Sequence, residues 1–161
     1  MRIVLAVLAL AMLATAGCSR FPPYDGPEVT RVVVHKSSRQ MYLLHGSEVL
    51  RSYDIELGFA PEGDKQVEGD GRTPEGSYII DRRNPNSAYY LSIGISYPNA
   101  EDRAEAAELG QSPGGDIFIH GTPRPWRRAE DWTAGCIAIS NREMREVYSM
   151  VGLGTQIDIL P

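Results

Sequence analysis

Short runs of apolar residues, mostly β-branched or aromatic, recur along the chain, and several of them alternate with polar residues. A period of two is typical of a β-strand with one buried face. The pattern predicts strands at residues 29–36, 41–44, 49–57, 77–81, 89–96, 116–119, 137–139 and 156–160. A Gly- and Pro-rich excursion, residues 58–76, interrupts them. This density of short strands predicts a mostly β fold with a sandwich-like or barrel core.

Two short helices complete the predicted fold. The first begins near Asn99, which precedes acidic residues typical of a first helical turn, and it ends at Gly110. In the second, Ser140 and Glu143 have the spacing of a capping box. Apolar residues then recur at helical spacing, at Met144, Val147, Tyr148 and Val151. We expect this second helix to pack one face against the sheet.

The N-terminus has the layout of a bacterial export signal. Arg2 precedes an apolar run, residues 3–16, and small residues follow. Residues 13–18 resemble a lipobox, which predicts a signal peptide at 1–17, lipidation of Cys18 and a Pro-rich tether at 18–28. An ordinary cleaved signal and an N-terminal membrane anchor are the alternatives. All three place the remaining domain, residues 29–161, outside the cytoplasm.

Composition narrows the classes of partner. The chain has 161 residues, of which 42% are hydrophobic, so we expect one compact domain with short appendages. Asp and Glu number 21 against 16 Lys and Arg, which gives a net charge of -5 and argues against nucleic acid as a partner. After the first twenty residues no apolar run approaches the roughly 20 residues that a membrane-spanning helix needs.

Candidate chemistry concentrates around a cysteine and a histidine. If Cys18 is lipidated, Cys136 is a lone exported thiol, which is either a buried hydrophobe or a nucleophile. His120 ends one predicted strand and Cys136 precedes another, so an imidazole can take the thiol proton. Gly135 permits a tight turn, and the N–H groups around Cys136 can donate to an oxyanion. His35 and His45 are interpreted as surface residues.

No cofactor or metal site is predicted. The chain lacks the clustered Cys and His ligands that zinc requires, and the acidic residues of 54–70 lack the spacing of a calcium loop. Between the histidine and the cysteine, Trp126, Arg127 and Trp132 can form one wall of a substrate groove, and Arg72 can line another. The alternatives are a loop packed on the domain, solvated arginines and a simple turn at residues 72–74.

These residues resemble a known family. His120 with the glycine after it, the later Thr133-x-Gly135-Cys136 and the upstream segment 69–78 resemble the L,D-transpeptidase catalytic domain of the YkuD family. The resemblance implies a β-sandwich-like catalytic fold and a cysteine nucleophile, Cys136, that acts on peptidoglycan stem peptides. It further implies that His120 is the general acid and base, that Thr133 orders the site, and that the Gly135 and Cys136 N–H groups hold the oxyanion.

Two positions depart from the family pattern. Ala134 stands where a His is usual, and Ala138 stands where an Arg is usual. Arg127, Arg128 or Arg142 can replace the missing cation. This form resembles a divergent branch, some of whose members cleave peptidoglycan linkages instead of forming them.

The expected activity is therefore a peptidoglycan L,D-transpeptidase that acts through a thioester at the meso-diaminopimelate to D-Ala bond. An L,D-carboxypeptidase, an endopeptidase or an amidase that releases wall-linked peptides is the alternative, and a non-catalytic peptidoglycan-binding lipoprotein is a further one. Expected partners are stem peptides, the membrane through the lipid, and a wall-linked lipoprotein. Because Ser19 differs from the Asp that retains lipoproteins in the inner membrane, we expect the periplasmic face of the outer membrane.

Overall fold

The computed structural model describes residue 21 and residues 23–161, so the predicted signal peptide and Cys18 lie outside the described residues. The strands are β1 (Arg31–His35), β2 (Gln40–His45), β3 (Glu48–Asp54), β4 (Gly76–Asn84), β5 (Ser92–Ile95), β6 (Phe118–Gly121), β7 (Ile137–Ile139) and β8 (Gln156–Leu160). The helices of this part are α2 (Ala100–Glu108), α3 (Asn141–Met150) and the 3-10 turn η2 (Arg124–Trp126).

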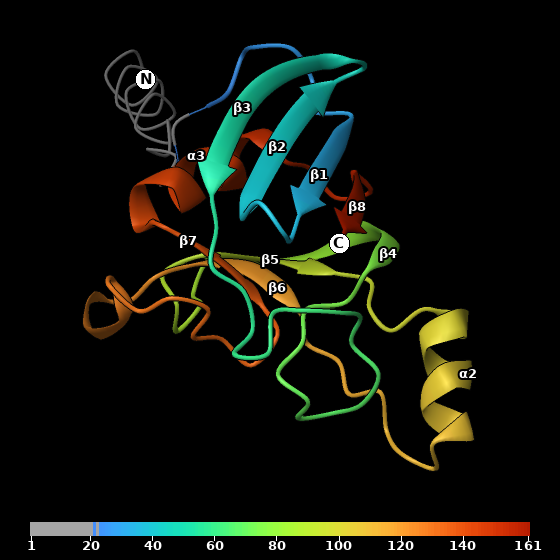
Figure 1. The fold of residues 1–161 in the computed structure, drawn as a ribbon. Helices are drawn as coiled ribbons and strands as arrows, with labels where there is room; N and C mark the ends of the chain where they lie inside the picture. Colours follow the sequence, from blue (N-terminus) through green and yellow to red (C-terminus); the bar gives the residue numbers. More distant parts are fainter. Residues whose placement is uncertain (1–20, 22) are drawn as a thin grey trace, which may run out of the picture.

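The strands form one strongly bent sheet in the order β3-β2-β1-β8-β4-β5-β6-β7. The pairs β1–β8 and β6–β7 are parallel, and the other neighbours are antiparallel. Figure 1 shows the sheet as two halves, with β1, β2, β3 and β8 in one and β5, β6 and β7 in the other. The long strand β4 belongs to both halves and carries a bulge between Ile80 and Arg82. The predicted mostly β, sandwich-like fold is confirmed.

The core forms where alternating residues of neighbouring strands face inward. Val32 of β1 lies opposite Leu43 of β2 and Ile157 of β8, and all three side chains are fully buried. Such apolar cross-strand rows stabilise a sheet because neighbouring side chains remove each other's surface from water. Helix α3 covers part of β5 and β6 with its buried face, which is made of Met144, Val147, Tyr148 and Met150.

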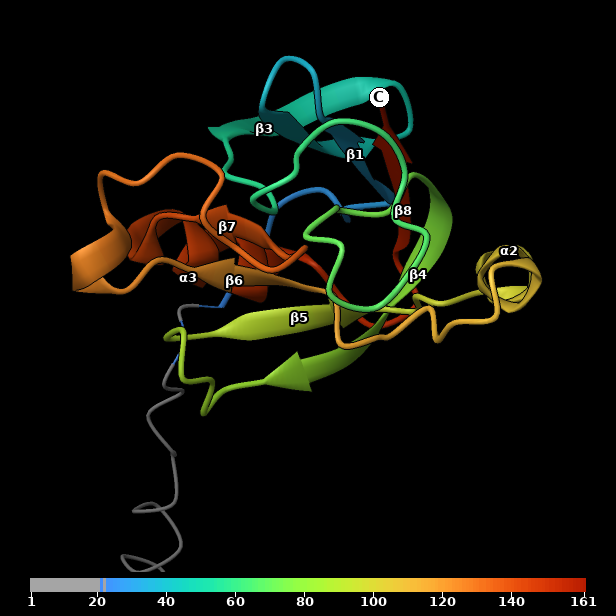
Figure 2. The same cartoon turned by 60° about the horizontal axis from the view of Figure 1, so that its bottom comes forward.

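The predicted strand at 49–57 is split in the structure. β3 ends at Asp54, and Glu56 then forms an antiparallel bridge with Ala138 of β7. Backbone N–H groups and carbonyls of Glu56 and Ala138 exchange hydrogen bonds of 2.9 and 2.8 Å. The chain therefore leaves one edge of the sheet and pairs with the other, which nearly closes the sheet into a barrel. Figure 2 shows the excursion after β3 beside the chain that enters β7.

The predicted strand at 89–96 begins later than expected, at Ser92. Tyr90 has a φ of 76°, a left-handed conformation that a β-strand does not continue through. This kink takes Tyr89 out of the sheet and sets its ring beside His120. Alternation in the sequence favours packing of Tyr89 in the sheet over a contact with substrate, so its stacking on His120 was not predicted.

Both predicted helix caps are present. Asn99 and Asp102 form a capping box at α2, and Ser140 and Glu143 form one at α3. At the other end of α3, the Arg83 guanidinium donates to the carbonyls of Tyr148 and Val151, which removes two orphan acceptors of a helix C-terminus. Within the described residues, no helix is long and apolar enough to span a membrane.

Candidate active site

A four-residue turn, 133–136, carries the candidate nucleophile into β7. The Thr133 side chain is buried, and its hydroxyl donates to the Cys136 carbonyl at 2.7 Å. The same hydroxyl oxygen accepts a hydrogen bond from Gly135 N at 3.1 Å. Thr133 thus closes the turn through its hydroxyl, and its role in ordering a catalytic site stays a prediction. Because Gly135 N–H donates to Thr133, an oxyanion role for that group requires it to exchange this partner, and the role stays a prediction.

Glycines let three backbone segments pack together beneath this turn. A Cβ on Gly58 would lie 2.0 Å from the Gly71 carbonyl oxygen and 3.0 Å from Gly135 Cα. Gly135 has a φ of 128°, and a Cβ there would lie 2.6 Å from the Arg72 carbonyl oxygen. Side chains are therefore excluded at both positions. Segments 57–60, 71–73 and 133–136 act as one support for the cysteine, and the contribution of Gly58 was not foreseen from sequence.

The Cys136 side chain is partly exposed and touches polar backbone. Its Sγ donates to the Asp116 carbonyl over 3.6 Å. Burial raises the pKa of the Cys136 thiol, and although a hydrogen bond from Phe118 N–H opposes the shift, the Asp116 carboxylate adds to it. At neutral pH the group is therefore a thiol and needs a base to become a nucleophile.

His120 is the third residue of β6 and is 3% exposed. Its Nδ1 lies 2.7 Å from the Gly121 carbonyl oxygen. A carbonyl can only accept, so Nδ1 carries the proton in this bond and the neutral ring has its lone pair on Nε2. Burial lowers the pKa of His120, and the bond to Gly121 offsets only part of that effect. The imidazole is thus neutral near pH 7 and able to accept a proton.

The fold brings these two residues to neighbouring parallel strands. His120 lies opposite Ala138 in the register, and Cys136 lies two residues before Ala138, directly ahead of β7. Among the residues that the structure describes, no hydrogen bond joins Sγ to His120, because Sγ bonds to Asp116. Catalytic hydrogen bonds are often formed only when substrate is bound. The structure therefore contains a neutral thiol and a neutral imidazole at the same edge, not a preformed ion pair.

Aromatic rings surround the imidazole. Tyr89 stacks on His120 with ring centroids 4.5 Å apart, and Trp132 meets the same ring edge-on at 5.7 Å. Trp126 stacks on Trp132 at 5.2 Å and is 47% exposed. Both tryptophans predicted to line a groove therefore lie beside His120, and Arg127 lines, together with Trp126, a cavity whose lining does not include His120 or Cys136. Their contact with substrate stays a prediction.

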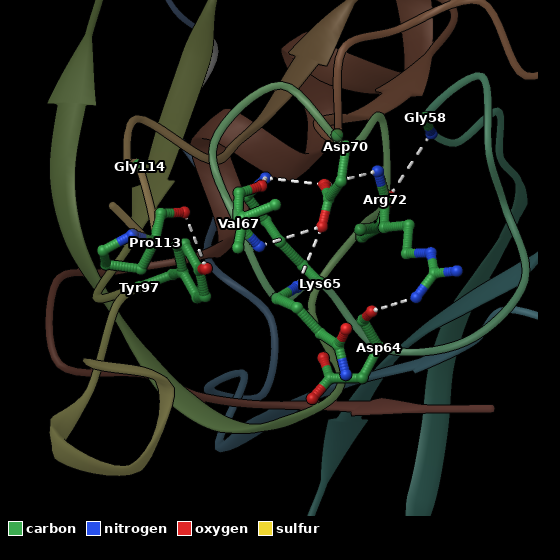
Figure 3. Close-up of polar contacts among 12 residues, drawn as sticks. Gly58, Asp64, Lys65, Val67, Asp70, Arg72, Tyr97, Pro113 and Gly114 are labelled. Atoms are coloured by element: carbon green, nitrogen blue, oxygen red, sulfur yellow. Dashed lines mark hydrogen bonds and ion pairs between the residues drawn. The ribbon is translucent and has the colours of Figure 1, made fainter. Parts of the chain in front are cut away.

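Figure 3 shows the network that holds the excursion in place. The Asp70 carboxylate accepts from Lys65 Nζ at 2.9 Å and from Arg72 N at 3.0 Å, as well as from the N–H groups of Gln66 and Val67. Burial alone would raise the pKa of Asp70, but these hydrogen bonds outweigh it and lower the pKa. Lys65 is 3% exposed, so the pair forms a buried ionic centre next to the site.

Arg72 takes part in the site through its backbone. Its carbonyl faces Gly135, while its guanidinium donates to the Asp64 carbonyl at 3.2 Å (Figure 3). The substrate-binding role predicted for this guanidinium is untested, and in this structure the side chain is occupied within the excursion.

Arg39, at the end of the β1–β2 turn, positions the loop that precedes Cys136. The sequence did not assign Arg39 to the site. Its guanidinium forms a forked ion pair with Asp131, with Nε–Oδ1 at 3.0 Å and Nη2–Oδ2 at 2.7 Å. Asp131 Oδ1 also accepts from Leu57 N at 3.0 Å. Asp131 directly precedes Trp132, so this pair fixes where the aromatic wall begins.

Lys36, in the same β1–β2 turn as Arg39, ties that turn to the excursion at residues 58–76. Its buried ammonium donates to the carbonyls of Gly63 and Thr73 and to Glu75 Oε1.

In the described part of the chain, no group of three or more His, Cys, Asp and Glu side chains is arranged to hold a metal ion.

Comparison with known proteins gives a family match over most of the chain. The model of the YkuD L,D-transpeptidase catalytic domain matches residues 29–159. YafK of Escherichia coli strain K12, provisionally named an L,D-transpeptidase, is 31% identical over 129 residues, which are 78% of this chain and 47% of YafK. YkuD of Bacillus licheniformis, named in the same provisional way, is 26% identical over 136 residues, which are 81% of this chain and 66% of that relative.

Solved structures agree with this match. The helical cell shape determining protein Pgp2 from Campylobacter jejuni has a TM-score of 0.63 at 28% identity, over 91% of this chain and 53% of Pgp2. An L,D-transpeptidase from Mycobacterium smegmatis has a TM-score of 0.55 at 15% identity, over 83% of this chain and 59% of that one, and shows the shared fold. This chain thus spans about half the length of YafK and of Pgp2.

Proposed function

The chain belongs to the L,D-transpeptidase catalytic domain family, and from this premise we propose that it is a cysteine-dependent peptidoglycan L,D-transpeptidase. The observation that carries the proposal is the buried His120, whose Nδ1 is held by the Gly121 carbonyl on the strand next to Cys136. His120 Nε2 is then free to accept a proton on the strand next to Cys136, which carries the only thiol of the described residues.

In the proposed reaction, His120 Nε2 takes the thiol proton as Cys136 Sγ attacks the carbonyl carbon on the L-centre of meso-diaminopimelate in a tetrapeptide stem. The C–N bond to D-Ala breaks, and D-Ala leaves as an amine with the proton from His120. A thioester remains. The amine of a second stem peptide then attacks the thioester, His120 takes its proton, and Cys136 departs as a thiol.

The neutral pair suits this sequence of steps. A thiol whose pKa is raised by burial stays protonated until the base removes the proton during attack, and an imidazole whose pKa is lowered by burial is available as that base. Removing either group should therefore abolish turnover, not merely weaken substrate binding.

Water can replace the acceptor amine, and the same thioester would then be hydrolysed. The chain would act as a carboxypeptidase, or as an endopeptidase or amidase on wall-linked peptides. Pgp2 is named as a helical cell shape determining protein. We propose that this chain also has a role in cell shape, through remodelling of the wall. The identity of the acceptor is decided by the experiment below.

The test is incubation of the 161-residue chain with a purified disaccharide tetrapeptide, with the products followed by mass. A dimer formed with loss of D-Ala, and absent with Cys136→Ala and His120→Ala, supports the transpeptidase. A tripeptide without dimer, dependent on the same residues, replaces the transpeptidase with the hydrolase. If neither this substrate nor lipoprotein-linked peptidoglycan yields a product that depends on Cys136, the enzyme proposal is overturned in favour of a binding module.

We also propose that Cys18 is lipidated and holds the domain at the periplasmic face of the outer membrane. The support is the sequence alone, since this residue lies outside the described part of the structure. Expression with labelled palmitate and membrane fractionation test it. Label and outer-membrane density should be lost in Cys18→Ala, and an unlabelled wild-type chain refutes the proposal.

A further inference from the structure

Tyr89 covers one face of the candidate base. Its ring lies nearly parallel to the imidazole of His120, with an interplanar angle of 27° and ring centroids 4.5 Å apart. Tyr89 is 41% exposed, whereas His120 is 3% exposed, so the phenol ring stands between that face of the imidazole and water. The proposed reaction gives this ring no part, although it touches the group that moves the proton.

The backbone around Tyr89 is shaped for this contact. Tyr90 has a φ of 76°, which bulky side chains rarely adopt, and such a conformation persists only where its surroundings hold it. Leu91 N donates to the Tyr89 carbonyl at 3.1 Å, and Arg145 Nε of α3 donates to Tyr90 Oη at 2.9 Å. The kink that turns the Tyr89 ring out of the sheet is therefore anchored on both sides.

Gly121 links Tyr89 to the hydrogen bond that orients the imidazole. A Cβ on Gly121 would lie 2.8 Å from the Tyr89 carbonyl oxygen, so the missing side chain lets the two segments touch. Gly121 N donates to the Leu91 carbonyl at 3.2 Å, and the Gly121 carbonyl accepts from His120 Nδ1 at 2.7 Å. The ring and the carbonyl that contact His120 thus belong to one hydrogen-bonded unit.

The positive charge that His120 acquires in the proposed reaction has no anionic partner in the described part of the chain. In the sheet, His120 lies opposite Ser92 of β5 and Ala138 of β7, which are both uncharged. Helix α3 meets this strand end through Asn141, whose Oδ1 would lie 2.4 Å from a Cβ on Gly121. A buried charge is costly unless a neighbouring group stabilises it.

The face of the Tyr89 ring can stabilise that charge. The titratable groups on the segments beside His120 are the thiol of Cys136 and the phenol of Tyr89. Burial lowers the pKa of His120 and the Gly121 carbonyl raises it, with no contribution from a charged side chain. An aromatic face attracts a cation that lies within about 6 Å of its centroid, and the attraction is strongest where water is excluded.

We propose that Tyr89 is a positioning residue that acts through His120: its ring keeps the imidazole on the Gly121 carbonyl and stabilises the positive charge that forms when Nε2 takes the thiol proton. The inference rests on the proposed function for that proton transfer. It gives the aromatic face the part that a carboxylate plays beside the histidine of a Ser-His-Asp triad.

The test measures the pKa of His120 by NMR titration of the histidine ring signals in the 161-residue chain with Cys136→Ala, so that the thiol does not titrate with it. The signal that His120→Ala removes belongs to His120. Tyr89→Leu keeps an apolar side chain without a π face and should lower the pKa of His120 by about 0.5–1. Tyr89→Phe keeps the face and should leave the pKa unchanged. Tyr90→Leu is the matched control, since the neighbouring ring lies against Arg145.

With Cys136 present, kinetics separate positioning from contact with substrate. Tyr89→Leu should lower kcat about three- to tenfold, the factor that corresponds to this change in pKa, and should leave KM near that of the parent chain. Tyr89→Phe should restore kcat. A ring that only binds substrate would raise KM in Tyr89→Leu and leave kcat unchanged, which contradicts the inference.

The inference is overturned if Tyr89→Leu leaves the pKa of His120 unchanged or raises it, if Tyr89→Phe lowers it as much as Tyr89→Leu does, or if Tyr90→Leu has the same effect. This failure is distinguishable from failure of the proposed function. Products that depend on Cys136, with a pKa of His120 that ignores Tyr89, would refute only the positioning role. A lowered pKa in Tyr89→Leu without any Cys136-dependent product would refute only the enzyme.

Discussion

Replacing Gly135 by Ala should damage both the fold and the site, because two penalties act at this position. The backbone has a φ of 128°, a region that L-residues rarely adopt. A Cβ would also lie 2.6 Å from the Arg72 carbonyl oxygen and 3.3 Å from Ile117 Cδ1. The first atom is backbone of the neighbouring segment, so it cannot rotate away as a side chain can.

The two penalties have known sizes. A non-glycine residue held in a sparsely populated backbone region costs on the order of 1–3 kcal/mol. Forcing an extra carbon into a packed site costs roughly 1–3 kcal/mol more. The sum of about 2–6 kcal/mol is a large part of the roughly 5–15 kcal/mol that keeps a domain folded. A melting point change of about 2–4 °C per kcal/mol makes the effect measurable.

The assay is thermal unfolding followed by circular dichroism, with two glycine controls in the same chain. Gly46 has a φ of 57° and no atom within 4 Å of the position that a methyl group would take, so Gly46→Ala carries the backbone penalty without the clash. Gly152 has open space and no such φ, so Gly152→Ala should be close to neutral. The expected order of destabilisation is Gly135→Ala, then Gly46→Ala, then Gly152→Ala.

The reasoning is refuted if Gly135→Ala lowers the melting point no more than Gly46→Ala does. That result would mean that the support under the turn yields without cost. Cys136-dependent turnover, measured on the folded fraction, should also fall in Gly135→Ala and stay unchanged in both controls.

Three further predictions concern the site. At pH 8, iodoacetamide should modify Cys136 more slowly in the native chain than in the unfolded chain, because burial raises the pKa of the thiol. The rate in the native chain should increase as the pH rises. Rapid modification of the native chain at pH 6 would contradict this prediction. Asp70→Asn should destabilise the chain by roughly 3–5 kcal/mol in denaturant unfolding at pH 7, because it leaves the buried Lys65 ammonium without its anion. The folded-state pKa of Asp70 is lowered, so the free energy of unfolding that its carboxylate contributes is present above the unfolded pKa near 4 and is lost as the pH falls through the folded pKa. The difference in free energy of unfolding between wild type and Asp70→Asn should therefore shrink in acid. A difference that does not change with pH would refute this assignment. Thr133→Val should lower the free energy of unfolding by about 1–3 kcal/mol and remove most of the turnover, because it deletes the hydroxyl that joins Cys136 O and Gly135 N. Thr133→Ser keeps a hydroxyl and should retain both stability and turnover. Equal behaviour of the two variants would show that the hydroxyl does not order the turn.

Local chemistry made much of the fold predictable. Alternating apolar residues place β1, β2 and β8 within a few residues of their observed bounds, since burial of one face acts on each strand separately. The caps at Asn99 and Ser140 were predictable because a capping box needs only residues three apart. The end of β3 and the start of β5 were not predictable from the sequence, because the bridge from Glu56 to Ala138 and the left-handed conformation of Tyr90 depend on distant parts of the chain.

The same division applies to the site. Spacing and residue type in the sequence pointed to Cys136 and His120 as candidates, because a thiol and an imidazole at strand ends are chemically distinctive, and the family resemblance added Thr133. Sequence alone did not show that Arg39 holds Asp131, that Tyr89 stacks on His120 or that Arg127 and Arg142 meet at one cavity. These contacts join residues that are far apart in the chain, and only the closure of the sheet brings them together. The protonation states follow from the same cause, because burial by the folded chain shifts the pKa values of His120 and Cys136 toward their neutral forms.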